Sequence, residues 1–321
     1  MNLIVDANNL AYRANVTSDL YTNRGERVSG IFGSLQMLQS YLRQPERRTK
    51  NRLLELLQEQ TGVESQFKRA VMCWDYGKSE RRMNLYPGYK GQRQVKRDLQ
   101  SEEDKAAFNQ FVDQMNQLHQ ILPKFAIKSL KIRGWEGDDL VYACSKLLGD
   151  EICVIVSTDK DMLQLVSDKV FVYSPFKDVL VTPNNFYQVV GVSKAAYMSY
   201  RVLVGDSSDN IGGVEGIGDK TAKDLLIKFK TLGGILLNRE QVMKSKRTSK
   251  IFDNLSLLDR NERLMNFIYV DLSEVEDEIK NILEDNLTFS DKEVKMFLAS
   301  KQFNSIMSDF IDWSDCFKKL S

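Results

Sequence analysis

Nine acidic residues stand where loops meet predicted helices or strands of this 321-residue chain. They are Asp6, Asp75, Glu136, Asp138, Asp139, Asp159, Asp161, Asp206 and Asp209. Each one alone is explained equally well as a helix cap or a first-turn acid that stabilises the helix dipole. Three clusters and two strand-end aspartates in one place would repel one another strongly unless cations neutralised them. The whole set therefore predicts a site for Mg²⁺, a hard cation that prefers oxygen ligands.

Such a site predicts hydrolysis of phosphodiesters, because two divalent ions about 4 Å apart can activate water and stabilise both oxygens of an in-line displacement. His119 is the only histidine, which excludes mechanisms that need two imidazoles and argues against a hydrolytic triad. Its helical, polar-flanked context predicts a surface position. The four cysteines show no CxxC spacing, so we expect reduced core thiols and no zinc site.

A glycine-rich run, GGVEGIGDKTA, resembles a phosphate loop at first sight. The pattern GxxxxGK[ST] starting at Gly213 places Asp219 where lysine is required, so an ATPase is rejected. Gly213, Gly216 and Gly218 instead suit a turn in which the backbone approaches a phosphate, with Lys220 at the start of the helix that follows. A glycine-rich connection without any ligand is the alternative.

A basic segment lies between Tyr76 and Arg97, with seven cations against the single acid Glu80. The cations are Lys78, Arg81, Arg82, Lys90, Arg93, Lys96 and Arg97. A solvated helix face is the alternative to a functional role. Because Tyr86 and Tyr89 are interleaved with the cations, the segment suits a single-stranded or frayed nucleic-acid end, whose bases stack on the rings.

Four β-rich runs at 3–5, 70–74, 152–156 and 170–173 are separated by helical patterns, which predicts a parallel sheet with helical crossovers. Asp6 directly follows the first run, Asp75 the second, and Asp159 comes three residues after the third. Ligands of open α/β sheets lie at the carboxyl ends of the strands, so one topology would bring these three acids together.

Helices are expected within 31–69, with a polar interruption, over 101–121, and from about 184 onward. The segment 76–100 is expected to be irregular, because Pro87, Gly88 and Gly91 break it. The tail after 271 is acidic and then helical, and no motif in it indicates a role. No apolar run reaches the roughly 18 residues of a membrane helix and no signal peptide is present, so we expect no membrane contact and a cytoplasmic location.

Six segments together resemble the 5′-nuclease family, which includes flap endonucleases, bacteriophage 5′-exonucleases with RNase H activity and the 5′-nuclease domain of bacterial DNA polymerase I. They are VDANNLAYR, WDYGKSERR, YPGYKGQR, GWEGDDL, VSTDKDMLQLV and VGDSSDNIGGVEGIGDKTA, in order from residue 3 to about 230. The chain length and the lack of a polymerase portion resemble the free-standing bacteriophage enzymes. Residues 43–69 and those after 271 lie outside the resemblance.

The resemblance implies an α/β, PIN-like parallel central sheet with flanking helices, a helical arch and a C-terminal helix–three-turn–helix region. Residues 1–183 would form the nuclease core, with the arch at about 76–100, and residues 184–321 the duplex-binding region and tail. It assigns Lys90 as the catalytic lysine at the base of the arch, with Tyr89, Arg93 and Lys96 contacting DNA. The glycine run, with Gly213, Gly216, Gly218 and Lys220, would hold duplex DNA with K⁺ on backbone carbonyls.

For the acids, the resemblance implies two ions, Mg²⁺ with Mn²⁺ as a substitute. The first site would use Asp6, Asp75, Glu136, Asp138 and Asp139, and the second Asp159, Asp161, Asp206 and Asp209. The implied activity is 5′-3′ exonuclease and flap endonuclease cleavage of DNA with 5′ ends or flaps, and RNase H cleavage of RNA:DNA hybrids. The implied setting is primer removal in replication, as a monomer in the (host cell) cytoplasm, with a replication clamp or single-strand-binding protein as a partner.

Two alternative functions remain open. A PIN-type endoribonuclease also uses strand-end carboxylates, but it is usually shorter and lacks the arch and the glycine-rich duplex element. A noncatalytic DNA-binding protein could keep the fold, although loss of several acids or of Lys90 would then be expected, and all are present.

Overall fold

The structure is a computed structural model that describes residues 1–45, 50–63 and 66–320, with the backbone alone at Gln94 and Lys96. The chain divides into two compact units. The sheet unit comprises Met1–Gly77, Ser101–Leu180 and Leu272–Ser321, and the helical unit comprises Lys78–Gln100 and Val181–Asp271. Each unit is described separately.

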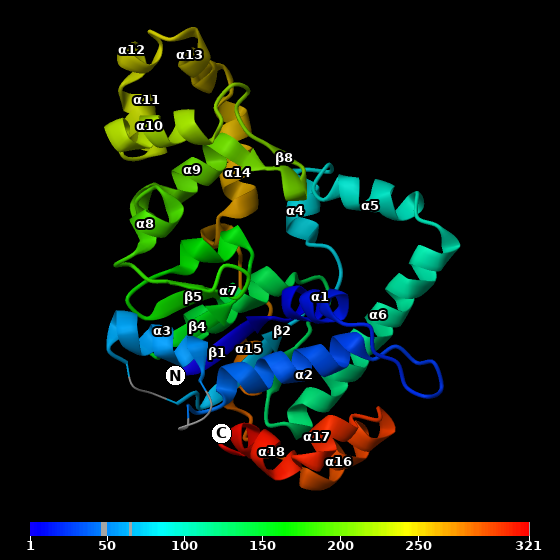
Figure 1. Cartoon of the computed structure of the whole chain (residues 1–321). Helices are drawn as coiled ribbons and strands as arrows, with labels where there is room; N and C mark the ends of the chain where they lie inside the picture. The colour runs from blue at the N-terminus through cyan, green and yellow to red at the C-terminus, as the bar shows by residue number, and fades with distance from the viewer. Residues whose placement is uncertain (46–49, 64–65, 321) are drawn as a thin grey trace. The chain divides into compact units, whose positions relative to one another are not determined.

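A six-stranded sheet in the order β3-β2-β1-β4-β5-β6 forms the centre of the sheet unit (Figure 1). Its strands are β1 Asn2–Asp6, β2 Arg69–Cys73, β3 Lys128–Leu130, β4 Cys153–Val156, β5 Val170–Ser174 and β6 Val179–Val181. The pairs β1–β2, β1–β4, β2–β3 and β4–β5 are parallel. All four predicted runs are confirmed as strands. The two strands of this sheet that were not predicted, β3 and β6, have three residues each, too few for a clear pattern.

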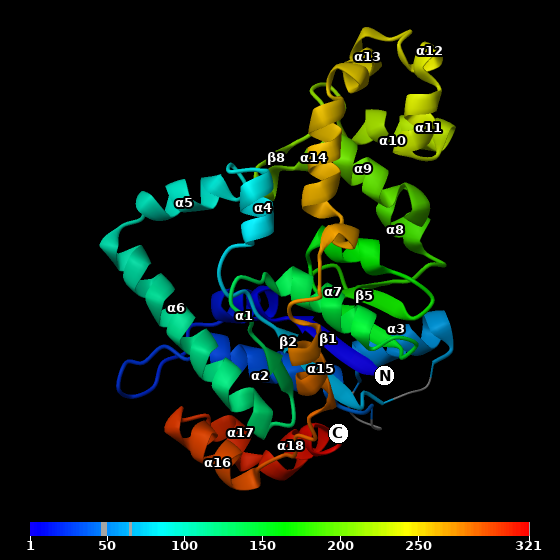
Figure 2. The same cartoon turned by 180° about the vertical axis from the view of Figure 1, so that it is seen from behind.

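Helices cover both faces of the sheet, with α2 on one face and α7 and α15 on the other (Figures 1 and 2). The predicted helices within 31–69 and over 101–121 are confirmed. Helix α6 begins where Ser101 accepts a hydrogen bond from the Asp104 amide at 3.1 Å, followed by three acids in the first turn. The helices are α1 Ala7–Thr17, α2 Ser29–Leu42, α3 Arg52–Thr61, α6 Glu102–Ile121, α7 Gly137–Leu147, α15 Glu276–Glu284, α16 Asp291–Ser300, α17 Asn304–Ser308 and α18 Phe310–Lys318.

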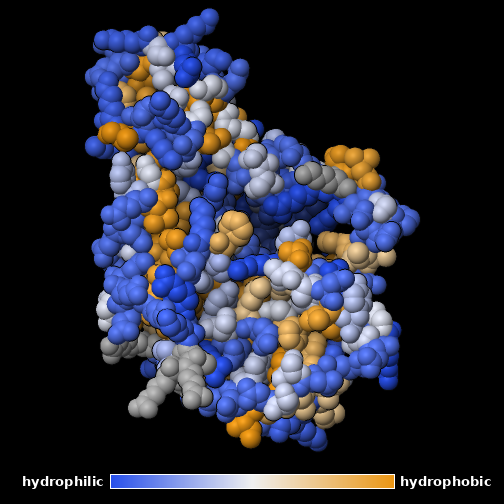
Figure 3. All heavy atoms as spheres, viewed as in Figure 1, coloured by the Kyte–Doolittle hydropathy of each residue, from blue (hydrophilic) through white to orange (hydrophobic). Residues whose placement is uncertain are grey.

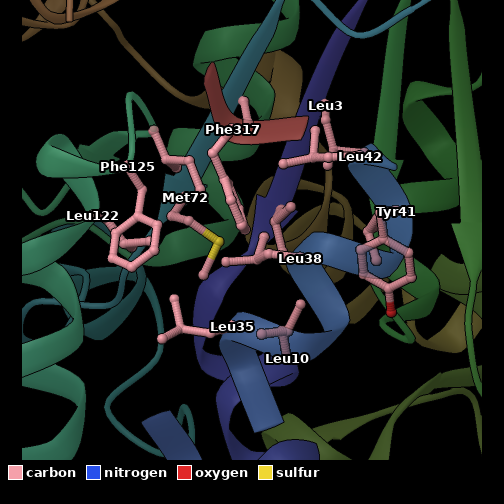
Figure 4. Close-up of a cluster of buried hydrophobic side chains, with 14 of the residues drawn as sticks. Leu3, Leu10, Leu35, Leu38, Tyr41, Leu42, Met72, Leu122, Phe125 and Phe317 are labelled. Atoms are coloured by element: carbon pink, nitrogen blue, oxygen red, sulfur yellow. The ribbon is translucent and has the colours of Figure 1, made fainter. Parts of the chain in front are cut away.

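The strands read as continuous apolar runs in the sequence because both faces of the sheet are buried. Leu3 belongs to the cluster on the α2 face of the sheet, and Ile4, the next residue along β1, points to the opposite face, as the pleat requires (Figure 4). The tail completes this cluster, because the Phe317 and Trp313 rings lie 5.3 and 6.2 Å from the Phe125 ring. The region after 271, unassigned from sequence, is therefore part of the core of the sheet unit.

The helical unit contains the segment expected to be irregular, and here the structure differs from the expectation. Two short helices form within it. Ser79 caps the first of them, because its hydroxyl accepts a hydrogen bond from the Arg82 amide. Pro87 and Gly88 confine the irregular part to the connection between them. The unit comprises α4 Glu80–Leu85, α5 Gly91–Asp98, α8 Phe186–Val190, α9 Tyr197–Val204, β7 Gly205–Asp206, β8 Ile211–Gly212, α10 Asp219–Phe229, α11 Leu232–Leu237, α12 Arg239–Val242, α13 Lys246–Asp253 and α14 Leu255–Met265.

The division into units does not follow the sequence boundary at residue 184. Residues 78–100 group with the helical unit because Arg82 Nε, on α4, donates to the Leu264 carbonyl on α14 at 3.0 Å. Residues 272–321 group with the sheet unit through the aromatic cluster of the tail.

The cysteines, His119 and the long helices each bear on a smaller expectation. The four cysteines are confirmed as free, buried thiols. The prediction that His119 lies on the surface is wrong, because its ring is half-buried against Trp74 and its Nδ1 lies 2.7 Å from Ser129 Oγ. Within the described ranges, no helix is both long enough and apolar enough to span a bilayer.

Candidate active site

Three aspartates stand at the carboxyl ends of neighbouring parallel strands in the sheet unit. Asp6 ends β1, Asp75 follows β2, and Asp159 follows β4. Strand β1 lies between the other two: the chain runs from β1 outward to β2 and β3, and then crosses to β4 on the other side of β1. This reversal makes the β1/β4 boundary the topological switch point where open α/β sheets bind ligands. The predicted gathering of these acids at one edge of the sheet is confirmed.

Asp6 is the most buried of the three, with 7% of its surface exposed. Its carboxylate accepts from the Asn9 amide at 3.0 Å and from Ser157 Oγ at 2.9 Å. Burial, with added repulsion from the charges of Asp75 and Asp159, raises the pKa of Asp6 to about 7 despite those two bonds. The carboxylates of Asp75 and Asp159 are thus close enough to oppose the ionisation of Asp6.

A second acidic group comes from the start of α7. The Gly137 amide donates to Asp75 Oδ1 at 2.6 Å and so ties this helix to the end of β2. A side chain at Gly137 would crowd the Cys73 carbonyl and the Asp75 carboxylate, which explains the glycine. Flanking it, Glu136 and Asp139 are 4% and 3% exposed, and Asp138 lies in the first turn.

The loop after β4 supplies Asp159 and Asp161. The Asp159 amide donates to Ser157 Oγ at 3.0 Å, and the Asp161 amide donates to Asp159 Oδ1 at 2.7 Å. Ser157 therefore bridges this loop to Asp6. Sequence reasoning missed Ser157, although its place two residues before Asp159 in STDKD was a usable signal.

Two asparagines that sequence reasoning also missed hold the same edge. Asn8 Oδ1 accepts from the Asp75 amide at 2.9 Å. Asn9 Nδ2 donates to Thr158 Oγ1 at 2.6 Å. The signal was the pair of amides that follows Asp6-Ala7, which connects the β2 and β4 loops to the start of α1.

The donor set of this edge suits a hard divalent cation, because it consists of carboxylate oxygens close enough for the charges of Asp75 and Asp159 to add to the effect of burial on the pKa of Asp6. Among the described residues, no three acids, histidines or cysteines are already placed to bind one ion together. Mg²⁺ usually keeps several waters and takes only one or two carboxylates directly, so the chemistry fits without a complete protein cage.

Lys90 lies in the helical unit, in the connection before α5. Its Nζ is 3.9 Å from Asp209 Oδ2 and 5.0 Å from the centre of the Tyr89 ring. Arg93 pairs with Asp209 Oδ1 at 2.7 Å, and the Tyr89 hydroxyl donates to Asp209 Oδ2 at 3.2 Å. Lys96 lies in α5, and its side chain falls outside the described residues.

Asp206 also has a cationic partner. Arg201 donates to it at 2.6 Å, and the Ser208 hydroxyl and amide donate at 2.7 and 2.8 Å. Burial opposes ionisation of Asp206, but the bonds from Ser208 and Arg201 outweigh it and lower the pKa. Asp206 and Asp209 therefore differ from Asp6, because arginines neutralise them, and binding a metal ion directly would require exchange of these partners.

The glycine run connects α9 to α10, as predicted, through the short β7–β8 ladder. A Cβ on Gly213 would overlap the Val204 carbonyl, and Gly216 has a φ of +83°. Gly218 is the N-cap of α10, and Lys220 is exposed in its first turn. The surface of this region, over α10 and α13, is mostly hydrophilic (Figure 3).

A parallel sheet with carboxylates at its switch point, together with a helical region carrying glycine turns and cations, defines the class of PIN-like nucleases. Comparison with known proteins gives the family. The model described as the 5′-3′ exonuclease N-terminal resolvase-like domain matches residues 1–191, and that of the 5′-3′ exonuclease C-terminal SAM fold matches residues 192–279. The chain belongs to the 5′-3′ exonuclease family and is a structure-specific 5′ nuclease.

Relatives are similar over most of their length. The 5′-3′ exonuclease of Buchnera aphidicola subsp. Schizaphis graminum is 31% identical over 75% of this chain and 74% of its own. That of Bacillus subtilis is 32% identical over 64% and 67%. The crystal structure of T5 D15 protein co-crystallised with metal ions is 26% identical, with a TM-score of 0.70 over 88% of this chain and 99% of that one. These findings decide between the alternatives in favour of the 5′ nuclease.

Proposed function

We propose that this protein cleaves DNA at or near 5′ ends and flaps with two divalent metal ions, Mg²⁺ with Mn²⁺ as a substitute. One observation carries the proposal: Asp6 is buried at the carboxyl end of its strand, and the nearby charges of Asp75 and Asp159 add to the effect of burial in raising its pKa to about 7. A cation bound among them relieves the repulsion between these charges and an ionised Asp6. The metal ions co-crystallised with the T5 D15 protein support this assignment.

The first ion would be held by Asp6, Asp75, Glu136, Asp138 and Asp139, and the second by Asp159, Asp161, Asp206 and Asp209. Bound divalent ions supply activation of water and stabilisation of the attacking and leaving oxygens, so no protein nucleophile is needed. Asp206 and Asp209 would first have to exchange Arg201 and Arg93, which makes coordination through water the simpler role for them.

Lys90 is assigned to the scissile phosphate, where its ammonium would steady the developing negative charge. Tyr89, Arg93 and Lys96 would contact the 5′ strand as part of an arch. Residues 213–220 would hold the duplex backbone, because exposed amides and Lys220 at the start of α10 suit phosphate, with K⁺ on the turn carbonyls.

A wider role follows from the same resemblance. We infer RNase H activity on RNA:DNA hybrids and a product with a 5′-phosphate, which would serve primer removal in DNA replication or bacteriophage DNA degradation. The protein would act as a monomer in the cytoplasm, the host cell's if a bacteriophage encodes it, and a replication clamp or single-strand-binding protein would suit it as a partner.

The test is cleavage of a 5′-labelled flap duplex with Mg²⁺ and with EDTA. The natural chain is compared with Asp159→Asn/Asp161→Asn and with Asp150→Asn, a matched control at the amino end of β4. Metal-dependent cutting near the junction that the double variant loses and the control keeps is expected. Binding without cutting under every metal tried would contradict the proposal.

The role of Lys90 is tested separately. Lys90→Ala should lower cleavage by roughly 100-fold or more while binding of the flap duplex changes little, because the ammonium stabilises charge that develops only during the reaction. Single-turnover rates and fluorescence-anisotropy titrations with Ca²⁺ in place of Mg²⁺ measure the two effects. Wild-type cleavage by this variant would remove the assignment.

A further inference from the structure

The connection that carries Lys90 is held by the neighbouring dipeptide Asp209-Asn210. The Lys90 amide donates to the Asp209 carbonyl at 2.9 Å. Asn210 Nδ2 donates to the Gly88 carbonyl at 2.8 Å, and Asn210 Oδ1 accepts from Gln92 Nε2 at 2.9 Å. One side-chain amide therefore grips the backbone two residues before Lys90 and the side chain two residues after it.

This turn has a conformation that needs external support. Lys90 has a φ of +53°, in the left-handed region that non-glycine residues adopt only when their surroundings impose it. Within the turn, the Gly91 amide donates to the Gly88 carbonyl at 3.0 Å. The same carbonyl accepts from Asn210, so the external bond reinforces the internal one.

Asp209 and Asn210 act on different parts of Lys90. Asp209 pairs with the Lys90 and Arg93 side chains, as described above. Asn210 contacts neither ammonium nor guanidinium but fixes the backbone from which the Lys90 side chain projects. It has a left-handed φ of its own, +60°.

We propose that Asn210 is a positioning residue, which clamps the turn from Gly88 to Gln92 and so aims the Lys90 ammonium at the scissile phosphate. This inference rests on the proposed role of Lys90. Positioning matters for rate because a displacement of about 1 Å of a catalytic group can lower turnover by roughly 100-fold.

The variant that isolates the clamp is Asn210→Gly, since glycine adopts the left-handed backbone without steric strain and lacks the side-chain amide. A matched control is Asn238→Gly in the same unit. Asn238 Nδ2 also donates to a glycine carbonyl, that of Gly234, at 2.8 Å, and Asn238 Oδ1 faces Gln241 Nε2 at 3.5 Å. The two substitutions thus remove the same chemistry at two places.

Two measurements are made on the full chain. Hydrogen exchange of the backbone amides over residues 88–93 should become about tenfold faster in Asn210→Gly and stay unchanged in Asn238→Gly. On the flap duplex with Mg²⁺, kcat should fall by roughly 10-fold to 100-fold with KM within about twofold. Gln92→Ala, which removes one of the two bonds, should give an intermediate fall.

The double variant Asn210→Gly/Lys90→Ala decides whether the amide acts through Lys90. It should cleave as slowly as Lys90→Ala alone, because there is then no ammonium to aim. A further fall in kcat would overturn the inference. So would exchange and kcat in Asn210→Gly that match Asn238→Gly, and in that case the proposed function would stand. Wild-type cleavage by Lys90→Ala would instead overturn the assignment of Lys90 itself, and with it the aiming role.

Discussion

Replacement of Asp6 by asparagine should make the metal-free protein more stable at high pH. The pKa of Asp6 rises from an ordinary 3.8 to about 7 in the fold, because of burial and the charges of Asp75 and Asp159. The folded chain therefore holds a proton that the unfolded chain has released. That contribution to stability is fully present below pH 4 and is lost as the pH rises through 7.

The size of the effect follows from linkage. Within the range from pH 5 to pH 8, there are about two pH units over which Asp6 holds a proton in the folded chain but not in the unfolded chain. Each of these units corresponds to about 1.4 kcal/mol of unfolding free energy. The free energy of unfolding of the natural chain should fall by roughly 3 kcal/mol relative to Asp6→Asn over this range. Asparagine keeps the cap on α1, since its oxygen can accept from the Asn9 amide.

Urea unfolding in EDTA at pH 5, 6, 7 and 8 measures this difference. Asp178→Asn is the control: a bond from Arg52 lowers the pKa of Asp178, so it stays ionised throughout, and its difference from the natural chain should be constant. Adding Mg²⁺ at pH 8 should stabilise the natural chain and not Asp6→Asn, because the ion replaces the proton. A difference between the natural chain and Asp6→Asn that is equal at pH 5 and pH 8 would refute the reasoning.

Two further predictions concern the helical unit. Lys220→Ala should weaken flap-duplex binding and reduce the slope of log affinity against log salt by about one, with kcat little changed, as titrations at several salt concentrations would show. A slope equal to that of the natural chain would exclude a phosphate contact. Gly213→Ala should lower the free energy of unfolding by roughly 2 kcal/mol or more, because the added Cβ overlaps the Val204 carbonyl, whereas Gly218→Ala, which has open space around it, should change stability by much less. Equal stability of the two variants in urea would contradict this account.

The sequence predicted the sheet well because its strands are buried on both faces and read as continuous apolar runs. The strand ends then located Asp6, Asp75 and Asp159, since the position of an acid after a parallel strand determines the edge on which it lies. The short β3 and β6 were missed, because three residues carry too little pattern.

What could not be predicted depends on contacts between residues distant in sequence. The bridge from Ser157 to Asp6 and the clamp from Asn210 to Gly88 are single hydrogen bonds across loops, and no local pattern encodes them. The prediction that His119 lies on the surface failed for the same reason: Trp74, which follows β2, packs edge-on against its ring.

The last helix of the chain has a consequence for biosynthesis. The Phe317 and Trp313 rings complete the cluster around Phe125, although the larger segment of the helical unit, Val181–Asp271, lies between them in sequence. During translation the sheet can begin to form early, but one side of its core stays incomplete until α18 has left the ribosome. A fragment that stops at residue 279, where the family match ends, would keep every proposed catalytic residue and expose this apolar surface to water. We therefore expect such a fragment to aggregate.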